Sequence, residues 1–120
     1  MCIRDRCLDV LRALRKEPEV RDALFTELQA ARGEHAAYDR SVEWLIEVFD
    51  DAASLEARSR LVVERTALAL QASLLLTSGH AAVADAFCRA RLADERGYAY
   101  GTLGAEAPLR TLIDRALPAL

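Results

Sequence analysis

The chain has 120 residues, of which 52% are hydrophobic and 6% aromatic, and its formal net charge is −3. This length fits a single domain whose core is built mainly from Ala, Leu and Val. The acidic balance argues against a protein that attracts nucleic acid by its bulk charge, and no apolar run is long enough to span a bilayer.

The first half of the chain predicts three amphipathic helices. The first runs from about Asp5 to Lys16, and its apolar face holds Cys7, Leu8, Leu11 and Leu14. It ends before Pro18, because the residue that precedes a proline disfavours helical dihedral angles. Pro18 suits the first turn of a second helix, which is expected to stop at Gly33. A third helix is expected from about His35 to Phe49.

The longest helix is predicted from about Leu55 to Thr77, with Ser54 as its N-cap. Its second half, TALALQASLLL, is apolar nearly all round, which is typical of a helix that is buried on several sides. We therefore expect this fourth helix to be the most buried element of the fold.

The last part of the chain predicts two more helices, separated by a loop that contains three glycines. The fifth helix runs from about Ala81 to Arg96, and a short final helix runs from about Pro108 to Leu117. The final helix is expected to turn its apolar side inward, with Leu109, Leu112, Ile113 and Leu117. No segment shows the alternation of a β-strand. Short connections between long amphipathic helices predict an all-α fold, an antiparallel bundle of about five helices plus a short C-terminal helix.

Residues that usually carry catalysis are sparse. The sequence has no glycine-rich nucleotide-binding loop, no H-E-x-x-H and no nucleophile elbow. Both histidines, His35 and His80, precede a predicted helix, which favours a polar role at the helix start over a metal ligand or a base. Trp44 lies beside an apolar stripe, which indicates packing, with a stacking platform as the alternative. The cysteines lack C-x-x-C spacing, which predicts free thiols in a reducing cytoplasm for Cys2, Cys7 and Cys88.

Arg12 is the most distinctive charged residue of the first helix. It follows Leu11 directly, at the edge of the apolar face. The pattern alone favours a boundary arginine that extends its guanidinium to water. A role in a functional site is the alternative.

Two pairs of arginines have a spacing of seven residues. Arg58 and Arg65 lie on the fourth predicted helix, and Arg89 and Arg96 lie on the fifth. Each pair shares a helix face and can match the spacing of phosphates. Residues 52–120 hold eight arginines and seven acidic residues, however, so a mixed solvated surface is favoured. We expect DNA binding through these arginines to be weak.

The stretch CLDVLRALRKEPEV, from Cys7 to Val20, resembles the alkylation-response (AidB-like) branch of the acyl-CoA dehydrogenases. In that family a W-E-G-S-G-N stretch runs directly into a C-L-D-V-L-R helix. The likeness continues through AAYDRSVEWL and AFCRARLADERG, and it covers nearly everything from Cys7 to about Leu112. The first six residues, MCIRDR, depart from the family and resemble translated sequencing-adapter sequence. We therefore expect a non-native leader over residues 1–6 and a truncated helical domain over residues 7–120.

The resemblance implies the C-terminal helical part of a FAD-dependent acyl-CoA dehydrogenase-like protein that is linked to the DNA alkylation response. The family's catalytic glutamate belongs to the W-E-G-S-G-N stretch, so this chain alone is expected to be inactive and to hold no flavin. By the family's motif, Arg12 is the arginine that faces that glutamate beside the flavin. The resemblance also implies a cytoplasmic homotetramer whose helices pack against N-terminal domains of the same protein. A non-catalytic helical module for DNA contact or oligomerisation is the alternative.

Overall fold

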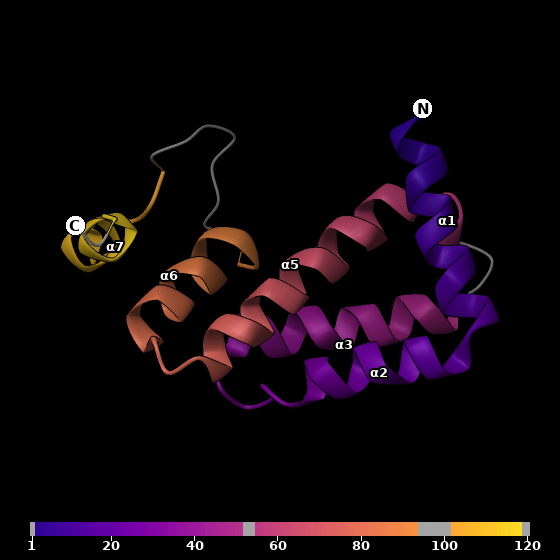
Figure 1. The fold of residues 1–120 in the computed structure, drawn as a ribbon, viewed down its shortest axis with the longest axis horizontal. Coiled ribbons are helices and arrows are strands. Elements are labelled where there is room, and N and C mark those ends of the chain that lie inside the picture. The colour runs from indigo at the N-terminus through magenta and orange to yellow at the C-terminus, as the bar shows by residue number, and fades with distance from the viewer. Residues whose placement is uncertain (1, 52–54, 94–101, 119–120) are drawn as a thin grey trace.

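The structure is a computed structural model that describes residues 2–51, 55–93 and 102–118. Helices joined by turns and loops make up this part of the chain, and no strand occurs in it (Figure 1). The all-helical bundle predicted from the sequence is therefore confirmed. The helices are α1 (Ile3–Lys16), α2 (Pro18–Gln29), α3 (Ala36–Asp50), α5 (Ser59–Thr77), α6 (Ala81–Arg91) and α7 (Leu109–Ala116).

The helix boundaries lie close to those that the sequence predicts. α1 begins at Ile3 rather than Asp5, and α5 begins at Ser59 rather than Leu55. Gly33 follows α2 with a φ of 89°, a left-handed conformation that a side chain would strain and that commonly ends a helix. α6 ends at Arg91, so the helix that was expected to continue to Arg96 is shorter than predicted. Ser54, expected to cap the long helix, lies outside the described residues, as does Arg96 itself.

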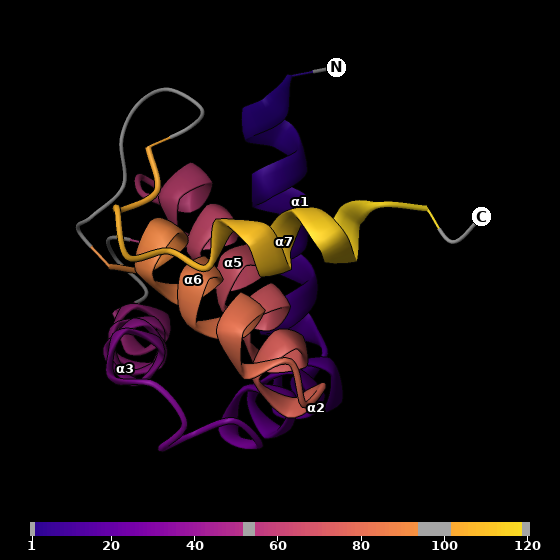
Figure 2. The same ribbon diagram turned by 90° about the vertical axis from the view of Figure 1, so that its left-hand side faces the viewer.

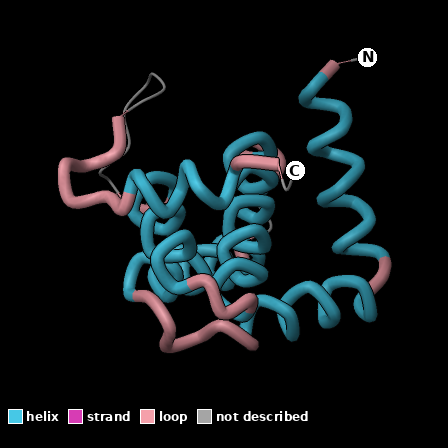
Figure 3. Tube along the Cα trace, turned by 60° about the vertical axis from the view of Figure 1, so that its left-hand side comes forward, coloured by secondary structure: helices cyan, strands magenta, loops and turns pink. Residues whose placement is uncertain are grey.

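α5 is the element around which the other helices are arranged. It packs against α1, α2, α3 and α6. In Figure 1 it runs diagonally above α2 and α3, with α1 near its first turns and α6 near its last. Figure 3 shows α1 at one edge of the molecule, where it runs across the direction of α2. Four residues of α5 are fully buried, namely Val62, Ala69, Ala72 and Ser73. Three of them are small, and small side chains let neighbouring helices approach closely.

The expectation that this long helix is the most buried element is wrong. Seven of the 15 residues of α3 are buried, against five of the 19 residues of α5. Leu74, in the apolar second half of α5, is 54% exposed. α5 is surrounded by other helices but buries mainly small residues, whereas its leucines are only partly buried or exposed. In α3, by contrast, the largest side chains face the core, with Tyr38, Val42 and Leu45 fully buried.

The inward orientation expected for the last helix is also wrong. α7 packs on α6 at the margin of the bundle, as Figure 2 shows, and none of its residues is buried. The exposed fractions are 51% for Leu109, 57% for Ile113 and 63% for Leu117, and only Leu112 is half-buried. Periodicity correctly groups these residues on one face of a helix, but it does not state which way that face turns.

Two buried hydroxyl groups join three helices at the C-terminal end of α2. The Tyr38 hydroxyl, from α3, donates to the Leu28 carbonyl at 2.6 Å. The Ser73 hydroxyl, from α5, donates to the Glu27 carbonyl at 2.9 Å. Both carbonyls belong to the last turn of α2, where helical carbonyl groups lack partners within the helix. Burial raises the pKa of Tyr38, and its contact with Ser73 opposes that rise.

None of the helices in the described part of the chain is long and apolar enough to cross a membrane.

Replacing Tyr38 with Phe should lower the free energy of unfolding by about 1–3 kcal/mol, because the buried Leu28 carbonyl then loses its donor. Ser73→Ala should act in the same direction through the Glu27 carbonyl. Urea unfolding followed by circular dichroism measures both changes, with the m-value as a check that the unfolding transition is otherwise the same.

Ser41→Ala is the matched control for these variants. The Ser41 hydroxyl is buried on α3 without a hydrogen-bond partner, so its removal should leave the free energy of unfolding unchanged or raise it. A Tyr38→Phe variant that is as stable as the unmodified protein would contradict the role assigned to the tyrosine hydroxyl.

Candidate functional site

Arg12 lies on the outer side of α1, while Cys7, Leu11 and Leu14 of the same helix pack inward. Its side chain is 64% exposed, and its guanidinium donates to Asp9 Oδ1 at 2.9 Å. An exposed ion pair of this kind stabilises a protein by at most about 1 kcal/mol, so Asp9 does not hold Arg12 firmly. The guanidinium is therefore available to a carboxylate or phosphate that reaches this face of α1.

The arginines of the two seven-residue pairs have separate surroundings. The Arg58 guanidinium lies 5.2 Å from the centroid of the Trp44 ring, a cation–π contact between the start of α5 and α3. Arg65 is half-buried, and Arg89 forms an ion pair with Glu106. The fourth member, Arg96, lies outside the described residues. Two of the candidate phosphate-binding arginines are thus engaged by other parts of the chain.

His35 has a structural role at the start of α3, as its position in the sequence predicts. Its Nδ1 accepts a hydrogen bond from the Ala37 backbone N–H at 3.1 Å and so caps the helix. This bond requires the tautomer with the proton on Nε2, which lies 3.4 Å from Asp85 Oδ1. Both ring nitrogens therefore have a polar contact, which supports a structural role for His35. His80 is exposed before α6 and makes no capping bond there.

The three cysteines are free, as predicted. Cys2 is exposed, whereas Cys7 and Cys88 are buried. Burial, with a smaller effect from the nearby Asp85 carboxylate, raises the pKa of Cys88 to about 11. A thiol that stays protonated at neutral pH is a poor nucleophile, so Cys88 is a packing residue of the core.

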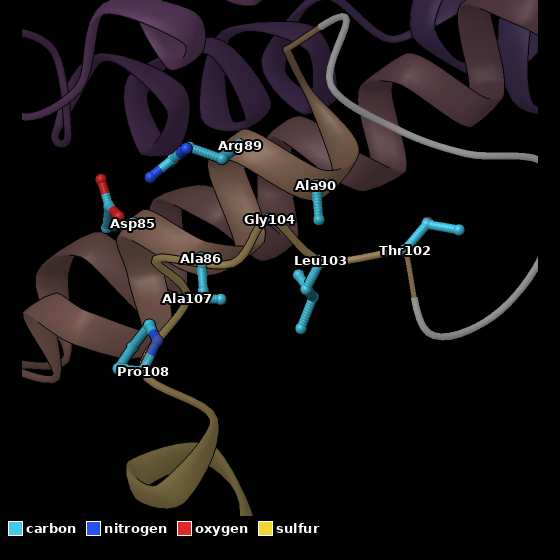
Figure 4. Close-up of a pocket in the computed structure, with 9 residues that line it drawn as sticks. All are labelled: Asp85, Ala86, Arg89, Ala90, Thr102, Leu103, Gly104, Ala107 and Pro108. Atoms are coloured by element: carbon cyan, nitrogen blue, oxygen red, sulfur yellow. The ribbon is translucent and has the colours of Figure 1, made fainter.

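Two hollows flank α6, and neither has the form of a cofactor pocket. The first lies between α6 and the segment before α7 and encloses about 20 Å³, room for about one water molecule (Figure 4). The second is a shallow hollow of about 450 Å³ between the first turn of α6 and α7, lined by residues that include His80, Thr111 and Arg115. Within residues 2–51, 55–93 and 102–118, no group of three His, Cys, Asp or Glu side chains is placed to hold a metal ion.

A cation–aromatic cluster lies between α2 and α3 that was not predicted from the sequence. The Phe25 and Phe49 rings meet edge to face with centroids 5.6 Å apart. The Arg21 guanidinium lies 5.7 Å from the first centroid and 5.9 Å from the second, and it reaches Asp50 Oδ1 at 3.3 Å. The helical spacing of Phe49 within the third predicted helix is visible in the sequence. Its aromatic partner on another helix, Phe25, is not. The cluster links Arg21 and Phe25 of α2 to the C-terminal end of α3.

Comparison of the chain with protein-family models, with curated proteins and with solved structures finds no match.

The free energy of unfolding should fall as the pH rises from about 9 to 11. A thiol whose pKa is raised on folding contributes stability fully below its unfolded pKa, and this contribution is lost as the pH rises through the folded pKa. Cys88 meets this condition, with a shift from 9.0 to about 11, and Tyr38 is shifted in the same direction. Chemical unfolding at a series of alkaline pH values measures the slope.

Cys88→Ala should make that alkaline slope shallower, whereas Cys2→Ala, at an exposed cysteine, should leave it unchanged. An identical slope in the Cys88→Ala variant and the unmodified protein would rule out the buried thiol as a source of the pH dependence.

Proposed function

We propose that this chain is the C-terminal helical part of a FAD-dependent acyl-CoA dehydrogenase-like protein linked to the DNA alkylation response. The observation that carries the proposal is the position of Arg12 within the CLDVLR segment of α1. Cys7 and Leu11 of that segment pack into the bundle, while the arginine extends outward on a largely exposed side chain. In the proposed parent protein this outward face of α1 borders the active site, and Arg12 faces the catalytic glutamate.

The exposed apolar residues of the bundle support a chain that packs against further protein. Val10 on α1, Val20 on α2 and Leu74 on α5 are each more than 40% exposed. Single exposed apolar residues are ordinary, but the three lie on helices that the proposal places beside other domains or subunits. In the proposed parent these residues pack against the N-terminal domains and against other copies of the chain in a homotetramer.

The flavin of the proposed parent is assigned to other parts of that protein. A flavin needs a pocket with backbone groups for its phosphates and a wall for its ring system, and neither hollow beside α6 has this form. The contribution assigned to this chain is electrostatic: the Arg12 guanidinium would donate a charge-assisted hydrogen bond that keeps the glutamate ionised and ready to abstract a proton.

A non-catalytic helical module is the second candidate function. The outward apolar face of α7 favours oligomerisation as the form that this module would take. DNA contact is less favoured, because Arg89 pairs with Glu106 and Arg58 lies against Trp44. Few arginines of the two seven-residue pairs then remain to neutralise DNA phosphates and release their counterions.

This polypeptide alone should retain no flavin and oxidise no acyl-CoA, whereas Arg12→Ala in the full-length parent should lower acyl-CoA turnover more than it lowers thermal stability. The first result follows from the missing pocket, and the second from loss of the charge that holds the glutamate ionised. The visible spectrum of the chain after incubation with excess flavin and desalting tests the first. Turnover and melting temperature of the parent test the second.

Arg15→Ala is the matched control in the parent, since Arg15 is another exposed arginine one turn further along α1. It should leave turnover near that of the unmodified parent. Retained flavin in the isolated chain would contradict the proposal. Equal turnover per folded molecule after Arg12→Ala, with a large loss of stability, would assign Arg12 a structural role instead.

DNA binding should be weak and strongly dependent on salt. An interface that neutralises several phosphates loses affinity steeply as salt rises, and mixed arginine and acidic surfaces present few unopposed cations. Titration of a labelled duplex at low and at physiological salt measures this. Tight binding that persists at physiological salt, and that Arg58→Ala and Arg65→Ala weaken, would favour the DNA-binding module over the enzyme part.

A further inference from the structure

The C-terminal arm, defined here as residues 102–118, lies on α6 without burying a hydrophobic face. α7 has no buried residue, and Leu109 and Ile113 are mostly exposed, whereas Leu112 is half-buried. An isolated helix of eight residues is far too short to be stable in water. The order of α7 therefore depends on its tertiary contacts. These are its own packing on α6, where Leu112 is half-buried, and the attachment of the turn before it.

An ion pair fastens this turn to α6. Arg89, on α6, pairs with the Glu106 carboxylate of the arm. The same carboxylate accepts a hydrogen bond from its own backbone N–H, and this bond and Arg89 together lower the pKa of Glu106. Glu106 thus has two polar contacts, although it is exposed to solvent.

Gly104 makes room for the Glu106 side chain. A Cβ atom at Gly104 would lie 2.6 Å from Glu106 Oε1, far inside contact distance. Gly104 does not have a positive φ, so the backbone itself would accept alanine and only the carboxylate would be displaced. In Figure 4 the chain at Gly104 passes over α6 beside Arg89 and then continues through Ala107 and Pro108 towards α7.

The turn lies directly against small side chains of α6. Ala86 is buried and Ala90 is half-buried where they line the hollow under the turn. That hollow encloses only about 20 Å³, so the turn and the helix are nearly in contact. Release of the turn would uncover this strip of α6 and would free α7 at the same time.

We propose that the C-terminal arm is a detachable strap, and that the Glu106–Arg89 ion pair seated over Gly104 is the latch that keeps it on α6. The strap has a docked state, in which α7 is helical, and a released state, in which α7 loses its support and the Ala86–Ala90 surface is open. A group that competes for either charge shifts the strap towards release. This inference is independent of the proposed enzyme function, because it concerns α6 and the arm alone.

Amide hydrogen exchange in the folded protein tests the latch. The Leu112 and Leu117 amides report on α7, since they donate to the Pro108 and Ile113 carbonyls at 3.1 and 3.2 Å. Glu106→Gln should raise their exchange rates about threefold to fivefold, the range that loss of a well-placed exposed ion pair allows. Gly104→Ala should raise them by a smaller factor, because the added methyl group displaces the far end of a flexible Glu106 side chain while both charges stay in place. The Val62 amide of α5 serves as the reference and should be unaffected.

Asp114→Asn is the matched control, because it removes an exposed ion pair with Arg110 inside α7 and leaves the latch intact. It should change the α7 exchange rates by less than about twofold, as for other pairs one turn apart on a helix. Three outcomes would overturn the proposal. These are unchanged α7 exchange in either latch variant, an equal increase at Val62, or an Asp114→Asn effect as large as that of Glu106→Gln.

Discussion

The fold depends on hydrogen bonds to the carbonyl groups in the last turn of α2. Carbonyl groups at the end of a helix have no partner within the helix, and burying them without a donor is costly. Here the Tyr38 and Ser73 hydroxyls supply the donors from two different helices. Each bond satisfies a carbonyl and also fixes the position of one helix against α2. The end of α2 is therefore the point at which α3 and α5 are brought into register.

The position of α1, and hence of Arg12, follows from that arrangement. α1 packs on α5 and α2 through Cys7, Leu11 and Leu14, so its orientation is set by helices that the buried hydroxyls hold together. Arg12 then extends away from the bundle with only a weak tie to Asp9. The arginines differ in what they contact. Arg21, Arg58 and Arg89 link elements of the bundle, whereas Arg12 is directed outward.

The bundle leaves part of its apolar surface uncovered, and this has two sources. α5 turns small residues towards its neighbours, so Leu74 remains outside, and α7 is held by a polar latch rather than by its own apolar side. Both arrangements favour contact with further protein over a fully closed domain. The C-terminal arm gives this surface two proposed states, docked and released, because the helix of the arm is supported while the turn before it lies on α6.

The sequence by itself determined the local features of this protein. Helical periodicity and the signals at Pro18 and Gly33 located the helices to within a few residues, because helix formation and helix ends depend on neighbours along the chain. The exposed position of Arg12 also followed from its place beside the apolar face of α1. The tertiary structure decided which faces are buried and which residues meet. The Tyr38–Leu28 and Ser73–Glu27 bonds span 10 and 46 residues, and Arg89–Glu106 spans 17. Periodicity carries no information across such separations, so the burial of α3, the outward face of α7 and the latch on α6 were set by packing alone.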